Sequence, residues 1–190
     1  MPENLRLFIA VELGSPLREQ LAEIQKELKK SGADAKWVKP ENIHLTLKFL
    51  GATASDKVES ISNALQEIAL LTPGFSATAS QLGAFPKIEY PRVIWVGISE
   101  GKTELENLGR KIEDRLFELG FSREERPFAA HLTLARIRSP LNRQSLVEKL
   151  KQAQFPAQTQ LIREIILFKS TLTPKGPIYE ALKRITLKAS

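Results

Sequence analysis

The chain is 190 residues long, 42% of its residues are hydrophobic, and its formal net charge is +6. This length suits one domain with a real core, and the charge favours anionic partners such as nucleic acid. The absence of cysteine excludes disulfides, thiolate metal sites and a cysteine nucleophile. No run of eighteen apolar residues occurs, and the first four residues lack the pattern of a secretory signal, so we expect a cytosolic protein with no membrane partner.

The first half of the chain predicts a strand, a helix, two strands and a second helix. Alternating apolar residues indicate a strand over residues 5–13. A helix is expected between Ser15, a candidate N-cap, and Gly32, which suits a left-handed end. A short strand over 36–38, a strand over 43–51 and a helix over 56–71 should follow.

The second half predicts a similar order. Strands are expected over residues 75–82 and 93–98, followed by a helix that begins with a capping box at Thr103 and ends at Gly120. The remaining elements are a strand that holds His131, a helix over 145–152, and strands over 163–169 and 178–187. Because no linker divides the sequence, we expect a single domain over residues 1–190, made of two interlocked lobes.

The only two histidines of the chain each begin the same tetrapeptide, His-Leu-Thr-Leu, at residues 44–47 and 131–134. With average protein composition, Leu-Thr-Leu follows a given histidine on the order of once in a thousand cases or fewer. Shifting the first half onto the second by the spacing of the histidines moves Phe8 onto Trp95, in the strand of each half that precedes the motif. We interpret this repeat as two similar lobes, each with one His-x-Thr strand. The alternative is that both halves share a common α+β order of strands and helices without a duplication.

In a regular strand, alternate side chains share a face. The odd-numbered residues of the first motif strand are apolar and should enter the core, whereas His44, Thr46 and Lys48 should share the open face. In the second copy, His131 and Thr133 take the open positions. If the lobes pair about an approximate two-fold axis, the two His-Thr faces meet across one cleft.

Such a cleft suits phosphoryl chemistry. An imidazole gains or loses a proton near neutral pH, so one histidine can deprotonate a nucleophile while the other protonates a leaving oxygen. The threonine hydroxyls can donate hydrogen bonds to non-bridging phosphate oxygens. Two histidines without an acidic cluster make a poor zinc site, so we expect neither a metal nor another cofactor.

The segments that carry this pattern resemble the 2H phosphoesterase superfamily, and within it the RNA 2′,3′-cyclic phosphodiesterases, also called 2′-5′ RNA ligases. The resemblance rests on Glu-Asn-Ile-His-Leu-Thr-Leu-Lys-Phe-Leu-Gly at residues 41–51 and on His-Leu-Thr-Leu-Ala-Arg at residues 131–136. Residues 6–10 and 92–97 also fit, so the resemblance covers nearly the whole chain. The chain departs from the family pattern at Ala130, because many members have proline before the second histidine.

This resemblance implies a bilobal α+β fold of pseudo-two-fold symmetry, in which two mainly antiparallel sheets flank a central cleft and the helices lie outside. It also implies hydrolysis of an RNA-terminal 2′,3′-cyclic phosphate to a 2′-phosphomonoester without a metal, with reversible ATP-independent 2′-5′ ligation of RNA in some members. We expect the protein to be a monomer, although the sequence does not fix the oligomeric state. By position, His44 and His131 match the catalytic pair, Thr46 and Thr133 match the phosphate-binding hydroxyls, and Arg136 matches a phosphate-binding arginine.

Two further residues are candidate substrate contacts. Phe8 is out of phase with its apolar neighbours, so we expect its ring to stack on a terminal base. Lys48 shares the predicted open face with His44 and can either bind backbone phosphate or remain a solvated charge. Phe49 has the opposite phase and is expected in the core.

Three other functions stay open at this point. The chain can be a nucleotide-binding module that uses the same cleft without chemistry, an RNA-binding scaffold that depends on its basic surface, or an enzyme for another small cyclic phosphate ester. The symmetry of the motifs also leaves the acid and base roles open. Our working assignment takes His131 as the base and His44 as the acid.

Overall fold

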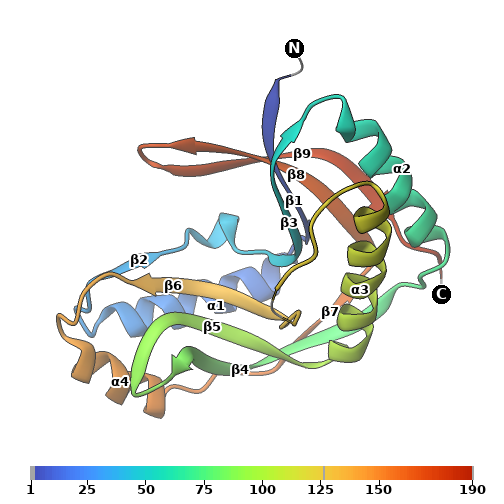
Figure 1. Ribbon diagram of the computed structural model, residues 1–190. Helices are drawn as coiled ribbons and strands as arrows, with labels where there is room; N and C mark the ends of the chain where they lie inside the picture. The colour runs from blue at the N-terminus through green and yellow to red at the C-terminus, as the bar shows by residue number, and fades with distance from the viewer. Residues whose placement is uncertain (1–2, 126, 190) are drawn as a thin grey trace.

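The computed structural model describes residues 3–125 and 127–189, which form nine strands, four α-helices and one short 3₁₀ helix (Figure 1). The strands are β1 (Asn4–Val11), β2 (Ala35–Trp37), β3 (Leu45–Ala54), β4 (Phe75–Lys87), β5 (Tyr90–Glu100), β6 (His131–Ile137), β7 (Gln158–Ile162), β8 (Glu164–Thr173) and β9 (Gly176–Thr186). The helices are α1 (Ser15–Lys29), α2 (Lys57–Leu70), α3 (Lys102–Glu118), α4 (Arg143–Gln152) and the 3₁₀ helix η1 (Pro40–Asn42). No helix in this part of the chain is long and apolar enough to cross a membrane.

The strands form two antiparallel sheets, and each sheet carries one of the two motifs. Sheet A has the order β3-β1-β8-β9, and sheet B has the order β2-β6-β5-β4-β7. The first motif enters β3 of sheet A, and the second opens β6 of sheet B. Figure 1 shows the two sheets diverging from the region where β3 and β6 begin, and these two strands are in contact. The expected α+β class with two antiparallel sheets is therefore confirmed.

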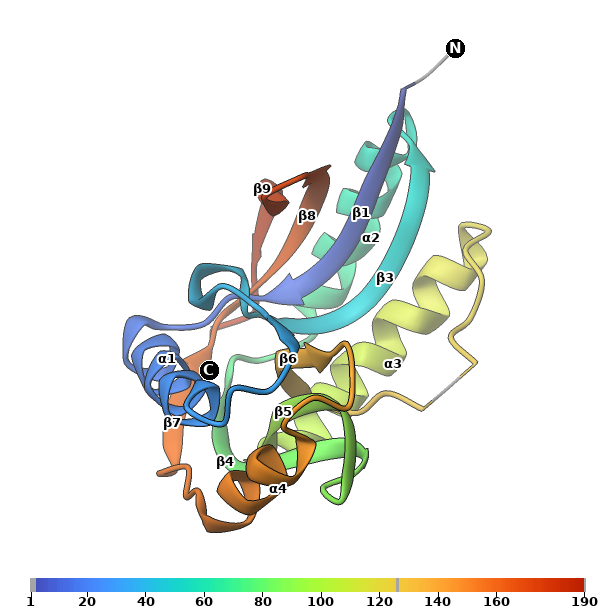
Figure 2. The same ribbon diagram turned by 90° about the vertical axis from the view of Figure 1, so that its left-hand side faces the viewer.

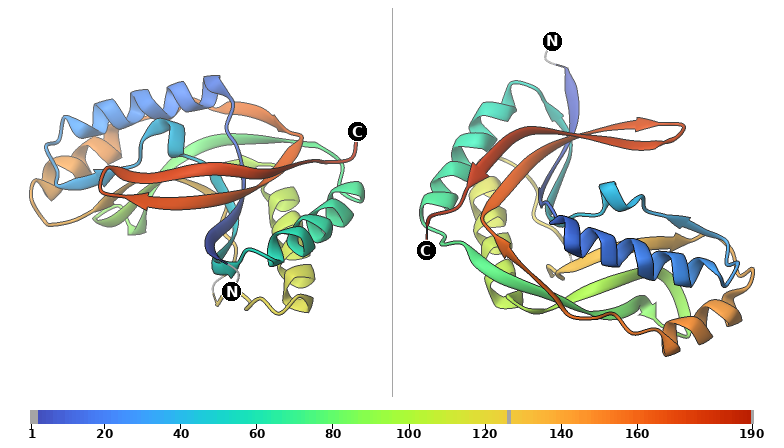
Figure 3. Two further views of the ribbon diagram at one scale, coloured as in Figure 1. Left: turned by 90° about the horizontal axis from the view of Figure 1, so that it is seen from above. Right: turned by 180° about the vertical axis from the view of Figure 1, so that it is seen from behind.

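Helices α1 and α3 each follow a strand of one sheet and pack on the side of the other. Helix α1 follows β1 of sheet A but packs against β7 and α4 on the side of sheet B. Helix α3 follows β5 of sheet B but packs against β3 and α2 on the side of sheet A. Figure 2 shows α2 behind sheet A, and the view from behind in Figure 3 shows α1 and α4 near each other beside sheet B. One hydrophobic core cluster consequently includes side chains from both sheets.

The sequence predicted most element positions, with local differences at helix starts. The stripe of α1 is buried as expected, and Gly32 has the left-handed φ of 68°. Ser15 is inside α1 instead of capping it, because the N-cap position is Gly14. Helix α3 likewise begins before Thr103, after a left-handed Gly101, so the expected capping box does not form. Strand β7 was not predicted.

Candidate active site

Both motif strands contain a β-bulge at the same position, the last leucine of His-Leu-Thr-Leu. Against β1, Thr46 pairs with Ala10 and Lys48 pairs with Ile9, which leaves Leu47 as the extra residue. Against β5, Thr133 pairs with Trp95 and Ala135 pairs with Ile94, which leaves Leu134 as the extra residue. A bulge inserts one residue without a partner and reverses the alternation beyond it. In each copy, the two residues after the threonine are therefore buried together.

His44 precedes β3 directly, and its imidazole packs against aromatic rings. Its ring stacks on Phe8 with 4.7 Å between centroids and meets Tyr179 edge-on at 5.2 Å. Phe8 in turn stacks on Phe168 at 5.1 Å. Phe8 and Phe168 belong to a second, smaller core cluster with Tyr179 packed against it, on the face of sheet A that we call the open face of sheet A. The imidazole is thus held by rings from three strands.

His131 is the first residue of β6 and lies beside a different aromatic pair. Trp95 is the cross-strand partner of Thr133, and its ring lies so close over Gly83 that a Cβ there would come within 2.4 Å. Phe85 packs against Trp95 at 5.0 Å and meets the His131 ring edge-on at 5.3 Å. These residues define the open face of sheet B. Aromatic contacts consequently orient both histidines, although different residues supply them.

The two histidines make the same backbone hydrogen bond. The Nδ1 atom of His44 lies 2.8 Å from the carbonyl oxygen of Asn42, and that of His131 lies 2.6 Å from the carbonyl oxygen of Ala129. A carbonyl only accepts, so each Nδ1 must carry the proton that it donates. In the neutral ring the Nε2 atom then holds the free lone pair. Both imidazoles therefore present Nε2 as the atom that takes or gives a proton.

Burial distinguishes His44 electrostatically. Its aromatic surroundings desolvate the imidazolium and lower the pKa of His44 below the ordinary value of 6.5, although the hydrogen bond to the Asn42 carbonyl partly offsets this effect. Tyr179, which borders the same ring, has a raised pKa because burial disfavours its phenolate. Both residues are therefore predominantly neutral at pH 7.

Arg136 lies on the same face of sheet B as His131 and Thr133, although its spacing from His131 is odd. The cross-strand partners of these three residues are Val93, Gly97 and Trp95, which alternate regularly along β5. The bulge at Leu134 supplies the extra residue that brings the arginine back to the open face. Arg136 is exposed, and it has no carboxylate partner within the described ranges 3–125 and 127–189.

Lys48 is not on the open face, and the prediction that it binds phosphate there is wrong. Its side chain is 2% exposed, and its ammonium group lies 2.6 Å from Glu113 of α3 and 3.0 Å from the carbonyl oxygen of Ser122. The bulge at Leu47 turns Lys48 toward the core side, where Glu113 neutralises it. Glu113 also accepts from the backbone N–H of Glu124, in the segment that leads toward β6. Lys48 thus ties β3 to α3 and to the segment that follows α3.

The two predictions for phenylalanine are also corrected. Phe8 is 3% exposed beneath His44, so its ring supports the imidazole and is not free to stack on a base. Phe49, expected in the core, is 61% exposed. It pairs with Phe8 across the strands, and their rings lie 6.1 Å apart, so Phe49 lies on the open face of sheet A. The same bulge that buries Lys48 turns Phe49 outward.

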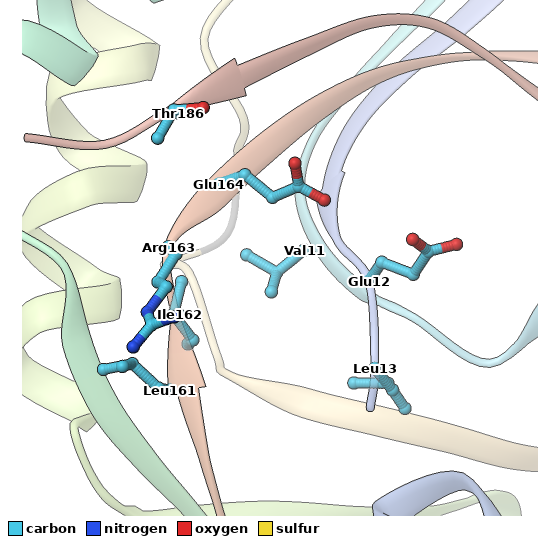
Figure 4. A pocket seen from close by; sticks show the side chains of 8 residues that line it. All are labelled: Val11, Glu12, Leu13, Leu161, Ile162, Arg163, Glu164 and Thr186. Atoms are coloured by element: carbon cyan, nitrogen blue, oxygen red, sulfur yellow. The ribbon is translucent and has the colours of Figure 1, made fainter. Parts of the chain in front are cut away.

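The pocket drawn in Figure 4 lies elsewhere, where β1 leads to α1 and β7 leads to β8. Its lining includes Glu12 and Glu164, whose carboxylates both accept from the guanidinium of Arg184 at 2.9 and 2.7 Å. None of the His-Thr residues lines it. Across the described ranges, no three His, Cys, Asp or Glu side chains gather in a way that suits a metal ion.

Two consecutive stretches of the chain, residues 11–95 and 96–179, match the family model described as LigT like Phosphoesterase. The chain belongs to this family. Each matched stretch contains one His-Leu-Thr-Leu motif, so the repeat of the motif coincides with a repeat of the family unit. The 2H phosphoesterase resemblance predicted from the sequence is confirmed.

Two curated relatives match over nearly their whole length. The RNA 2′,3′-cyclic phosphodiesterase of Archaeoglobus fulgidus is 38% identical over 181 residues, which cover 94% of this chain and 98% of the relative. The protein of the same name from Methanothermobacter thermautotrophicus is 36% identical over 177 residues, which cover 93% and 95%.

Solved structures confirm the fold. The protein TT0787 of Thermus thermophilus superposes with a TM-score of 0.80 at 27% identity, covering 98% of this chain and all of that one. E. coli LigT complexed with 3′-AMP superposes with a TM-score of 0.78 at 26% identity, covering 97% and 99%. The chain therefore has the fold that was expected from its family.

Proposed function

We propose that the protein hydrolyses the 2′,3′-cyclic phosphate at the end of an RNA chain to a 2′-phosphomonoester. The observation that carries this proposal is the duplicated geometry of His44 and His131. Each donates Nδ1–H to a carbonyl two residues earlier, each is followed by a threonine on the same face, and their strands are in contact. Two such imidazoles provide an acid and a base for one phosphorus centre. The names of the relatives support the same activity.

The proposed reaction is one in-line displacement at phosphorus. Nε2 of His131 takes a proton from water as the water oxygen attacks phosphorus. The bond from phosphorus to the 3′-oxygen breaks, and Nε2–H of the His44 imidazolium gives its proton to that oxygen. The products are a 2′-phosphomonoester and a free 3′-hydroxyl, and the two histidines exchange protons with solvent before the next turnover.

Thr46, Thr133 and Arg136 are the proposed phosphate ligands. The hydroxyls donate hydrogen bonds to the non-bridging oxygens, on which charge increases in the transition state. The guanidinium of Arg136 is exposed and lacks a carboxylate partner within the described ranges, so an incoming phosphate does not have to displace an existing ion pair. Lys48 and Phe8 are excluded from this proposal because they are buried.

To act as the acid, His44 must be in its imidazolium form, which burial makes the minor form at pH 7. An imidazolium that is destabilised by burial releases its proton more readily to the departing 3′-oxygen. Because Nδ1 donates its hydrogen to the Asn42 carbonyl, Nε2 is the nitrogen of the imidazolium that gives up its proton. His131 remains as the base, in agreement with the working assignment.

We further propose that the enzyme acts as a monomer in the cytosol, without a metal. Both histidines come from one chain, so the acid–base pair does not require a second copy. If a 5′-hydroxyl of RNA replaces water as the nucleophile, the same displacement forms a 2′-5′ linkage without ATP.

The test is to incubate the protein with an oligoribonucleotide that ends in a 2′,3′-cyclic phosphate, in the presence of EDTA and without ATP. We expect many turnovers and a 2′-phosphate terminus, identified by its resistance to an enzyme that removes only 3′-phosphates. A 3′-phosphate product, or no reaction, contradicts the proposal. Tight binding of the oligonucleotide without turnover favours the alternative of a nucleotide-binding module.

A further inference from the structure

Lys36 lies directly across from Arg136 on neighbouring strands of sheet B. In the antiparallel register of β2 and β6, Lys36 pairs with Arg136, and the next residue, Trp37, pairs with Ala135. Ala135 is buried in the hydrophobic core, and Trp37 packs against that core. Because successive side chains of a strand point to opposite faces, Lys36 points away from the core, as Arg136 does. Both cations therefore lie on the open face of sheet B.

Lys36 extends the row of proposed substrate contacts to the outer edge of the sheet. Strand β2 is an edge strand and lies beside β6 (Figure 1). Along β6, His131 comes first, Thr133 second and Arg136 third, and Lys36 lies next to the last of these on the outer strand. Lys36 is therefore placed for an anion beyond the one that the histidines and Arg136 hold.

The two cations lack internal neutralisation. Lys36 and Arg136 are both exposed, and neither forms an ion pair within the described ranges 3–125 and 127–189. Like charges directly opposite each other on neighbouring strands destabilise the pairing. A lysine on an edge strand also discourages pairing with another chain, but this protection does not require an arginine opposite it. Two cations in register therefore point to a ligand with more than one negative charge.

We propose that Lys36 binds the phosphodiester that precedes the terminal nucleotide of the RNA substrate. This inference rests on the proposed hydrolysis of the cyclic phosphate, and it adds a second phosphate subsite. Arg136 contacts the cyclic phosphate, and Lys36 contacts the next phosphate of the same strand. The two long side chains start from Cβ atoms about 5 Å apart, so their charged groups reach neighbouring phosphates. The site consequently favours the end of an RNA chain over a free cyclic mononucleotide, which has no second phosphate.

A lysine at this position recognises charge and not sequence. Its ammonium group is a point charge without the forked geometry of guanidinium, and contacts to phosphate carry no information about the base. Each phosphate that a protein neutralises on a single strand releases counterions and adds about 0.7 to the slope of log affinity against log salt concentration. The dependence of KM on salt therefore reports this contact.

The test compares two dinucleotides that differ in one charge. In both, 2′-deoxyadenosine precedes adenosine 2′,3′-cyclic phosphate, and the linkage is a phosphodiester in one and an uncharged methylphosphonate in the other. For the phosphodiester substrate, Lys36→Ala should raise KM at low salt about fivefold, the effect of one exposed ion pair, and should reduce the salt slope by about 0.7. For the methylphosphonate substrate, KM should not change. Lys57→Ala, which removes an exposed lysine at the start of α2, should change neither KM.

Two results overturn the proposal. One is an unchanged KM of Lys36→Ala for the phosphodiester substrate, and the other is an equal loss on both dinucleotides, which indicates a structural role of Lys36 in β2. Binding of the corresponding dinucleotide 2′-monophosphates, measured by calorimetry, separates this proposal from the proposed function. If the protein turns over neither dinucleotide, the hydrolysis proposal fails. The Lys36 proposal then requires that Lys36→Ala weakens binding of the phosphodiester form alone, about fivefold, and any other result, including absence of binding, overturns it.

Discussion

The imidazole of His44 stacks on the ring of Phe8, with 4.7 Å between centroids and 30° between planes. The phenylalanine that the sequence suggested as a base-stacking residue thus supports a catalytic candidate from beneath. This contact, together with Tyr179 at the ring edge, partly shields the imidazole from water. The chemistry of the site and the packing of sheet A are therefore coupled through one side chain.

The first prediction concerns the titration of His44. Because burial lowers its pKa, we expect its ring resonances to titrate with a midpoint below 6.5, and its neutral form to carry the proton on Nδ1. The chain contains only two histidines, so NMR of ¹⁵N-labelled protein resolves them, and a His131→Gln variant assigns the remaining signal. A midpoint for His44 at or above 6.5, or a neutral form protonated on Nε2, would contradict the geometry.

The second prediction is a dependence of stability on pH. Since the folded pKa of His44 is below the unfolded value near 6.5, the unfolded chain binds this proton first as the pH falls. The contribution of His44 to the free energy of unfolding is therefore fully present above pH 6.5 and is lost as the pH falls through its folded pKa. In urea unfolding at pH 7.5 and 5.5, the original protein should lose more stability than His44→Gln does. Equal losses would count against a desolvated His44.

The third prediction concerns Arg136. Replacing it by alanine should lower kcat/KM about a hundredfold, and lysine should restore only part of this loss, because an ammonium group lacks the forked geometry of guanidinium. Arg138 is exposed just beyond the end of β6 and is the matched control. Arg138→Ala should leave kcat/KM within about twofold. Equal losses of kcat/KM in the two alanine variants would show that activity depends on positive charge alone and not on the face to which the bulge directs Arg136.

The fourth prediction separates structure from chemistry at Lys48. Glu113→Gln leaves the buried ammonium of Lys48 without its counter-charge and should cost about 3 kcal/mol of unfolding free energy. Lys48→Met should cost less, because Glu113 is more exposed than Lys48 and regains water. Arg115→Gln, which breaks exposed pairs on the same helix, should cost less than about 1 kcal/mol. Similar values for Glu113→Gln and Arg115→Gln in urea unfolding would contradict this account of the pair.

The sequence predicted the motif residues well because two-residue periodicity is a direct signal. His44 and Thr46 on one face, with Leu45 and Leu47 buried, follow from alternation in a regular strand. The same rule fails beyond Leu47, because a bulge adds a residue and leaves no signal in the pattern of apolar residues. Lys48 and Phe49 were consequently assigned to each other's faces.

Arg136 illustrates the same limit of strand alternation in the second motif strand. Alternation alone places it opposite His131, and only the family resemblance indicated that it belongs to the site. The bulge at Leu134 explains why Arg136 nevertheless shares the face of His131. When the two copies are aligned, Lys48 matches Ala135 and Phe49 matches Arg136. The small apolar Ala135 indicates that the fourth residue after the histidine is buried, and this signal could have revealed the shared bulge.

The central claim is that His44 and His131 act together on one phosphate within one chain. The most direct measurement is the single-turnover rate on an oligoribonucleotide with a 2′,3′-cyclic phosphate end, for His44→Ala, His131→Ala, and an equimolar mixture of the two. Each variant should lose between about a hundred and ten thousand fold, and the mixture should be as slow as its components. A variant that keeps the original rate, or a mixture that recovers it, would contradict a shared site.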